Sequence, residues 1–148
     1  MLARPHNALR WSHLEQFFHN GRGEARDRLH DLVRNRAGEL SAPDRSLVEA
    51  VVLSGRRVSE LAPLAGCTAR VLRRRLKGVL ARISSPEFGY VLRHRSEWPL
   101  TRRRVAEACV LRGLSQRAAA SELRLSLYVV RLHEGAVLAM ARCGHNAA

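Results

Sequence analysis

Apolar residues recur every three to four positions along almost the whole chain, the spacing that places them on one face of a helix. No alternating apolar and polar run is long enough for a convincing strand. The pattern therefore predicts an all-α protein.

Two helices are predicted ahead of Ser41. The stripe of the first ends at Asn20-Gly21 and consists of Leu9, Leu14, Phe17 and Phe18. The stripe of the second ends near Gly38 and consists of Leu29, Leu32 and Val33. Because this segment carries little net charge, we expect it to be packing material.

Three further helices are predicted between residues 41 and 84. Ser41, Pro43 and Asp44 resemble a helix start with a capping box, and the helix that follows ends at Gly55. A short second helix ends at Gly66 and contains Pro63, which should distort it. Thr68 then caps a third helix. Its apolar face consists of Leu72, Leu76, Val79, Leu80 and Ile83.

The chain repeats itself when residues 45–83 are aligned with 103–141 without a gap. In that register 12 of 39 positions are identical, including Val71/Val129 and Arg73/Arg131. Ser115 and Ser126 fall where helix caps are expected in the second copy, whose last helix should run to about Arg142. Two copies are too few for a solenoid and predict tandem small units.

This register divides the chain into five parts. We expect an N-terminal helical segment over 1–40, a first three-helix unit over 41–84 and a second, diverged unit over 101–143. Residues 85–100 are too apolar for a flexible tether and should form a packed connector, and 144–148 should be a tail. The predicted fold is two tandem three-helix helix-turn-helix units after an N-terminal helical pair.

The charge of the chain points to a polyanionic partner. The 148 residues carry 26 Lys and Arg against 13 Asp and Glu, a net charge of +13, and nucleic acid is the first candidate. All basic residues but Lys77 are arginine, which favours bidentate phosphate and guanine contacts and equally fits a GC-rich genome.

Other function classes find little support. Three dispersed cysteines fit a reduced cytosol, and neither a membrane span nor a signal-peptide core is evident, so we expect a soluble, intracellular protein without membrane partners. No nucleophile motif, phosphate-binding glycine loop or zinc-ligand spacing occurs. We therefore expect no enzyme activity, no cofactor and no metal.

Residues 66–76 read Gly-Cys-Thr-Ala-Arg-Val-Leu-Arg-Arg-Arg-Leu. The sequence Glu60-Leu61-Ala62 begins six residues ahead of Gly66. This stretch resembles region 4 of bacterial sigma factors, of the sigma-70 family. The resemblance covers 41–83 without a gap and recurs more loosely from Gly113 to Arg131. It implies a cytoplasmic, nucleoid-associated bacterial protein that binds double-stranded DNA, with RNA polymerase as a further partner.

A recognition helix contacts bases from its N-terminal half. If the apolar face of the third helix points inward, its outward residues are Ala69, Arg70, Arg73, Arg74 and Lys77. Arg56, Arg57 and Arg75 suit phosphate contacts, and Thr68 completes the predicted DNA-binding set. Between Arg56 and Arg82 there are eight basic residues and one acid, Glu60.

The second copy diverges on this surface. Its outward positions are Leu127, Tyr128, Arg131, Leu132 and Gly135, after Ser126. These residues form either a protein-binding face or a second DNA reader that uses Tyr128 and Arg131. Glu134 replaces the core residue Leu76, which predicts a rotated helix or an ion pair with an arginine.

The leading hypothesis is a sequence-specific DNA-binding regulator or RNA polymerase accessory protein. It is not a complete sigma factor, because the lead over 1–40 is too short for the domain that reads and melts the other promoter element. The sequence is compatible with a homodimer. The alternative is a protein-interaction adaptor with a degenerate helix-turn-helix. Binding of structured RNA is disfavoured, because no exposed aromatic platform is evident.

Overall fold

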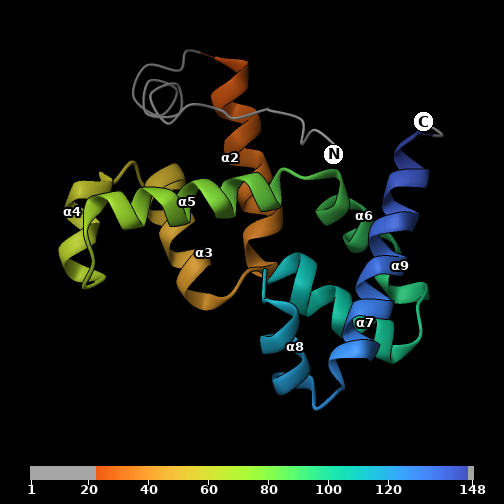
Figure 1. Cartoon of the computed structure of the whole chain (residues 1–148). Coiled ribbons are helices and arrows are strands. Elements are labelled where there is room, and N and C mark those ends of the chain that lie inside the picture. The colour runs from red at the N-terminus through yellow and green to blue at the C-terminus, as the bar shows by residue number, and fades with distance from the viewer. Residues whose placement is uncertain (1–22, 147–148) are drawn as a thin grey trace, which may run out of the picture.

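The structure, a computed structural model, describes residues 23–146 (Figure 1). Every regular element in this range is helical, and the range contains no strand, so the all-α prediction is confirmed for this part of the chain. The helix expected over Leu9–Phe18 lies outside the described residues. None of the described helices combines the length and apolar character needed to cross a bilayer.

The α-helices of residues 23–146 are joined by short turns. In chain order they are α2 (Glu24–Arg36), α3 (Ala42–Val48), α4 (Val58–Leu64), α5 (Ala69–Ile83), α6 (Pro86–His94), α7 (Leu100–Ala106), α8 (Gln116–Leu123) and α9 (Leu127–Asn146). Shorter elements extend them: the 3-10 turns η1 (Ala37–Glu39) and η3 (Arg95–Glu97), and the π-helical turns η2 (Glu49–Leu53) and η4 (Glu107–Leu111).

The register of the sequence repeat recurs in the element boundaries. The first residues of α3, η2, α4 and α5 align in that register with the first residues of α7, η4, α8 and α9 respectively. The repeat also extends further upstream than the sequence identity, because the last residues of α2 and η1 align with those of α6 and η3. Residues 86–97 are therefore the second version of the α2–η1 segment and not only a connector. We call 24–83 the first copy and 86–146 the second copy.

Helix caps explain where several elements begin. The side chains of Thr68, Ser115 and Ser126 accept hydrogen bonds from backbone amides three residues ahead, at 3.3, 3.1 and 3.2 Å, which confirms the three predicted caps. The capping box predicted at Ser41 is wrong, because its side chain makes no capping hydrogen bond. Asp44 points instead to two arginines of α5.

One hydrophobic core joins the two copies. Leu76 and Ile83 of α5 belong to the same buried cluster as Phe88 of α6, Leu111 of η4 and Val137 of α9. The apolar face predicted for α5 is buried throughout. A second, smaller cluster lies within the second copy and includes Val105, Ala119 and Val130. The copies therefore share a core at their seam.

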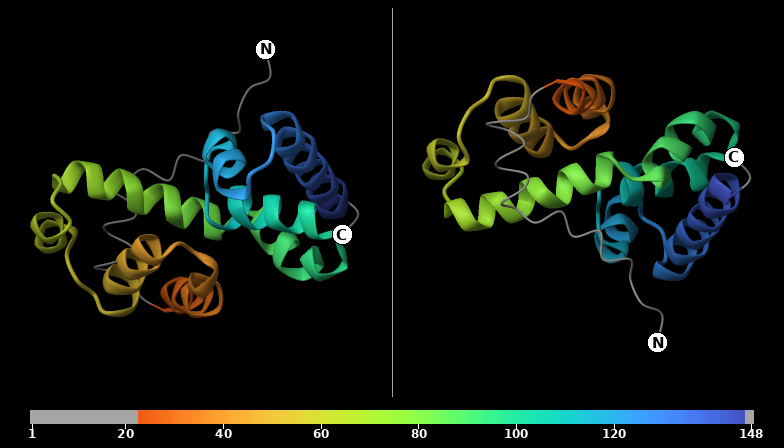
Figure 2. Two further views of the ribbon diagram at one scale, coloured as in Figure 1. Left: turned by 90° about the horizontal axis from the view of Figure 1, so that it is seen from below. Right: turned by 90° about the horizontal axis from the view of Figure 1, so that it is seen from above.

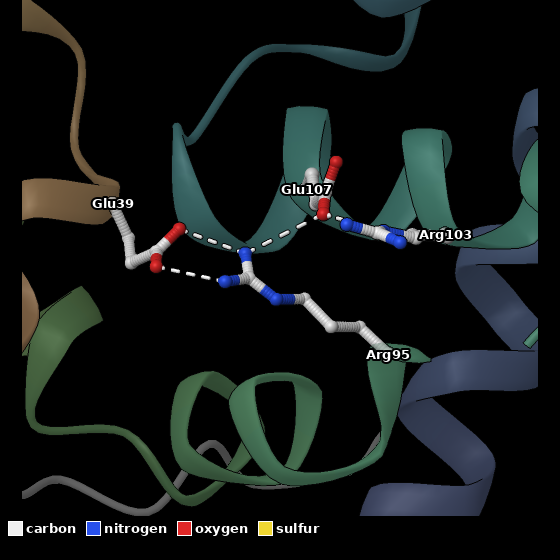
Figure 3. A network of polar contacts seen from close by, with 4 residues as sticks. All are labelled: Glu39, Arg95, Arg103 and Glu107. Carbon is white, nitrogen blue, oxygen red and sulfur yellow. Dashed lines mark hydrogen bonds and ion pairs between the residues drawn. The ribbon is translucent and has the colours of Figure 1, made fainter. Parts of the chain in front are cut away.

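Ion pairs reinforce the seam. Figure 3 shows Arg95 between Glu39 of the first copy and Glu107 of the second, with nitrogen–oxygen distances of 2.7 and 2.8 Å to Glu39 and 3.4 Å to Glu107. Glu107 also accepts a hydrogen bond from Arg103 at 3.1 Å. The hydrogen bonds to Glu39 raise the pKa of Arg95 despite its partial burial. This network ties η1 to η3 and η4.

Candidate nucleic-acid interface

The turn between α4 and α5 is sharply defined. Gly66 has a φ of +65°, and the amides of Cys67 and Gly66 bond the carbonyls of Ala62 and Pro63 at 3.1 and 3.2 Å. This pair of hydrogen bonds around a left-handed residue is a Schellman-type C-cap, and it ends α4. Pro63 does not prevent α4 from beginning at Val58, and the helix ends one residue after the proline.

The N-terminal half of α5 presents three exposed arginines, of which Arg75 is paired with Asp44. Arg70 and Arg74 are both exposed, and neither forms an ion pair with any residue in 23–146. The other predicted outward residues are less exposed: Ala69, Arg73 and Lys77 are half-buried, and Ala69 packs against the core. The outward face of α5 is therefore narrower than the sequence pattern suggested.

Two apolar side chains of α4 and α5 are exposed as well. Val71 is 56% exposed although it lies within the first turn of α5, and Leu64 at the end of α4 is 82% exposed. The sequence pattern does not reveal this exposure, because apolar residues within a predicted helix are expected to face the core.

This surface lies at one end of the molecule. In Figures 1 and 2, α4 and the start of α5 form the extremity remote from α9, with no helix of the second copy over them. Arg56 and Arg57, in the turn before α4, are exposed as well. No described helix of the second copy therefore lies over the end of the molecule that carries Arg70 and Arg74.

Arg75 differs from Arg70 and Arg74 because it forms an ion pair within the protein. Its guanidinium contacts Asp44 at 2.8 and 2.9 Å, and Arg82 reaches the other Asp44 oxygen at 2.9 Å. Burial by itself raises the pKa of Asp44, but the hydrogen bonds and charges of Arg82 and Arg75 outweigh it and leave the pKa lowered. This cluster ties α3 to α5, so the phosphate contact predicted for Arg75 competes with an internal pair.

The equivalent positions of the second copy present apolar groups. Tyr128 and Leu132 of α9 stand where Arg70 and Arg74 stand in α5, and they are 73% and 55% exposed. Leu127 is half-buried, and Ser126 is occupied as the helix cap. Arg131 is exposed, and its Nε donates to Gln116 at 3.2 Å.

Glu134 corrects a further prediction. Its carboxylate accepts a hydrogen bond from the amide nitrogen of Gln116, at 2.5 Å, and not from an arginine. The helix is not rotated either, because Val130 and Val137 are buried as their counterparts Leu72 and Val79 are. The hydrogen bond from Gln116 of α8 therefore satisfies the carboxylate of Glu134 at a position that is apolar in the first copy.

The Asp44 cluster has no equivalent in the second copy as far as residues 86–146 are described. The counterparts of Asp44 and Arg75 are Arg102 and His133. The Nε atom of Arg102 and the Nδ1 atom of His133 are buried without hydrogen-bond partners.

The described residues do not indicate cysteine or metal chemistry in the second copy. Burial and the nearby Glu134 raise the pKa of Cys109 to about 11, which disfavours a reactive thiolate. Residues 23–146 contain no group of three or more His, Cys, Asp or Glu placed to hold a metal ion.

Comparison with protein-family models, with curated proteins and with solved structures found no match to this chain. The described residues include the capped helix α5, whose Arg70 and Arg74 are exposed and lack ion-pair partners among residues 23–146, at an end of the molecule over which no helix of the second copy lies.

Proposed function

We propose that this chain binds double-stranded DNA through the N-terminal half of α5 and regulates transcription, as a sigma region 4-like regulator or an RNA polymerase accessory protein in the bacterial cytoplasm. The observation that carries the proposal is the pair Arg70 and Arg74, exposed on a capped helix and without ion pairs to the described residues. One helical turn separates them, so both guanidiniums reach the same side of a groove.

The surroundings of α5 support a nucleic-acid partner. Arg56 and Arg57 are exposed at the turn before α4, where phosphate contacts would fix the orientation of the protein on the duplex. Glu60 is the only acid between Arg56 and Arg82. A surface of this composition attracts a polyanion and repels cations.

The order of elements agrees with a helix-turn-helix reader. Helices α3 and α4 both pack against α5, and the Asp44 ion pairs fix α3 relative to α5. In such readers the final helix enters the major groove while the preceding helix crosses the backbone. The resemblance of residues 66–76 to sigma region 4 assigns the same role to α5.

Selection of bound duplexes from a random pool tests the proposal. A reader that uses α5 alone is expected to enrich one short element, whereas two half-sites about one helical turn apart would indicate a dimer or a second reader. Engagement of six or more phosphates predicts a fall in affinity of roughly 10³ or more between about 50 and 200 mM salt.

A matched pair of variants separates base reading from general charge. Arg70→Ala/Arg74→Ala removes two positive charges from α5, and Arg104→Ala/Arg117→Ala removes two exposed charges from the second copy. The first variant should lower affinity for the selected site by about 10- to 100-fold and abolish sequence preference. Equal losses in both variants would show that only net charge matters and would contradict the proposal.

A protein-interaction adaptor is the second candidate, and the exposed pair Tyr128 and Leu132 favours it. They lie one turn apart on α9 and form an apolar strip that a soluble monomer seldom exposes without use. Under this proposal Tyr128→Ser/Leu132→Ser leaves DNA affinity unchanged. A loss of DNA affinity in that variant would instead assign α9 to the DNA interface.

A further inference from the structure

A hollow of about 290 Å³ lies at the seam between the copies, away from the N-terminal half of α5. Its wall comes from the end of α2, the turn from α5 to α6, α6 itself and the end of α9. The lining residues are Arg36, Ser84, Ser85, Pro86, Gly89, Tyr90, Arg93, Ala141, Gly144 and His145. None of them is acidic.

Two guanidinium groups converge in this hollow above Gly89. A Cβ atom at Gly89 would lie 2.9 Å from Nη2 of Arg36 and 3.4 Å from Nη1 of Arg93, so the absent side chain is what lets both groups approach. Arg36 is further held by a hydrogen bond to the carbonyl of Ile83 at 2.7 Å, and by the ring of Phe88 at 5.8 Å from its centroid. Arg93 is exposed and makes no ion pair with any described residue.

The convergence is electrostatically unfavourable as it stands. Burial and the nearby charge of Arg93 lower the pKa of Arg36, whose only described side-chain hydrogen bond goes to a neutral carbonyl. Elsewhere in residues 23–146 paired arginines share a carboxylate: Arg75 and Arg82 share Asp44, and Arg95 and Arg103 share Glu107. The hollow contains Arg36 and Arg93, but its lining has no carboxylate between them.

We propose that this hollow binds the phosphate group of a small phosphorylated ligand between Arg36 and Arg93. Two guanidiniums match the geometry of phosphate oxygens and bind them through charge-assisted hydrogen bonds. Ser84 and Tyr90 line the same hollow and add hydroxyl groups. A volume near the lower limit of small-molecule sites suits a phosphate with a small organic group.

Occupation would have a structural consequence. Arg36 belongs to α2 of the first copy and Arg93 to α6 of the second, so a bound phosphate would bridge the copies across their seam. The ligand would stabilise the relative placement of the copies by adding its binding free energy to the folded state. This inference does not depend on DNA recognition by α5.

Calorimetric titration of the full chain with inorganic phosphate tests the site. We expect saturable binding of one phosphate per chain, weakened roughly tenfold or more in Arg93→Ala. Arg34→Ala is the matched control, because Arg34 is exposed on α2, outside the hollow and without an ion pair to residues 23–146. Absence of saturable binding, or equal weakening in both variants, would overturn the proposal.

A second variant and a second ligand sharpen the result. Gly89→Ala places a methyl group against both guanidiniums and should also weaken phosphate binding, while the circular dichroism of helix stays unchanged. Arg70→Ala/Arg74→Ala should bind phosphate like wild type, so failure of the proposed DNA function leaves this site intact. A duplex affinity that falls in Arg93→Ala but not in Arg34→Ala would assign the phosphate to the DNA backbone and contradict a small ligand.

Discussion

The first and second copies share the first residues of their last three α-helices but differ on the outer face of the last helix. Arg70 and Arg74 of α5 become Tyr128 and Leu132 of α9, at positions that are exposed in both copies. The buried positions of the same helices keep their apolar character, apart from Glu134. The repeated arrangement of helices thus tolerates a change from charged to apolar side chains at these two exposed positions.

The copies also differ in how their last helix is joined to the helices before it. In the first copy Asp44 links α3 to Arg75 and Arg82 of α5. In the second copy Arg102 replaces Asp44 and His133 replaces Arg75. A hydrogen bond from Gln116 of α8 to Glu134 of α9 joins the helices there instead. The arginine-rich α5 is thus braced by ion pairs to α3, which hold its outer face in one orientation.

Removal of Asp44 should give the largest difference between the copies. Asp44→Ala leaves Arg75 and Arg82 without their carboxylate and should lower the free energy of unfolding by about 2–3 kcal/mol, because a partly buried ion cluster loses its central charge. Arg102→Ala, at the equivalent position, should cost less than about 1 kcal/mol. Urea unfolding of both variants measures this, and equal losses would show that the cluster is not specific to the first copy.

The same cluster predicts a pH dependence. Because the pKa of Asp44 is lower in the folded chain, its contribution is fully present above the unfolded pKa of about 3.9 and is lost as the pH falls through the folded value. The stability difference between wild type and Asp44→Asn should therefore be constant near neutrality and shrink in acid. A difference that grows below about pH 4 would mean that Asp44 is not the stabilising ion.

Two equivalent glycines should respond differently to alanine. Gly55 and Gly113 have similar positive φ angles of 65° and 69°, but of the two only Gly113 has a neighbour that a Cβ would meet, the guanidinium of Arg82. Gly55→Ala should cost about 1 kcal/mol from backbone strain, and Gly113→Ala about 2 kcal/mol, since Arg82 must also move. Thermal unfolding distinguishes them, and a smaller loss at Gly113 would exclude the contact across the seam.

The smallest expected effect concerns the turn before the last helix. Gly66 of the first copy is replaced by Arg124, which adopts the same left-handed conformation with a φ of 55°. Arg124→Gly should stabilise the protein by up to about 1 kcal/mol, and Gly66→Ala should destabilise it by a similar amount. Denaturant midpoints of the two variants measure this. Destabilisation by Arg124→Gly would reveal a role of the arginine side chain.

Local signals predicted much of the frame. The cap at Thr68, the turn at Gly66 and the buried stripe from Leu72 to Ile83 each depend on residues close in sequence, and each was predictable. The helical repeat over 86–97 was not recognised, because little beyond the pairs Val33/Val91 and Glu39/Glu97 marks it in the sequence. The π-helical turns were also missed, since one inserted residue barely disturbs a helical period.

The polar arrangement of the surface required three dimensions. Arg75 belongs by spacing to the same charge run as Arg74, yet its partner Asp44 lies on another helix. The convergence of Arg36 and Arg93 over Gly89 joins three positions that share no motif. The partner of a long, flexible side chain depends on which groups lie near it in the fold. The helical period of a sequence does not show which groups those are.

Photocrosslinking to a bound duplex tests most directly the claim that the first copy contacts DNA through α5. A photoreactive residue is placed at Val71 of α5 or at Leu132 of α9, which are similarly exposed, at 56% and 55%, and whose replacement keeps every arginine. DNA contact through α5 predicts crosslinks to bases from position 71 and none from position 132. Crosslinks from position 132 alone, or equally from both, would contradict it.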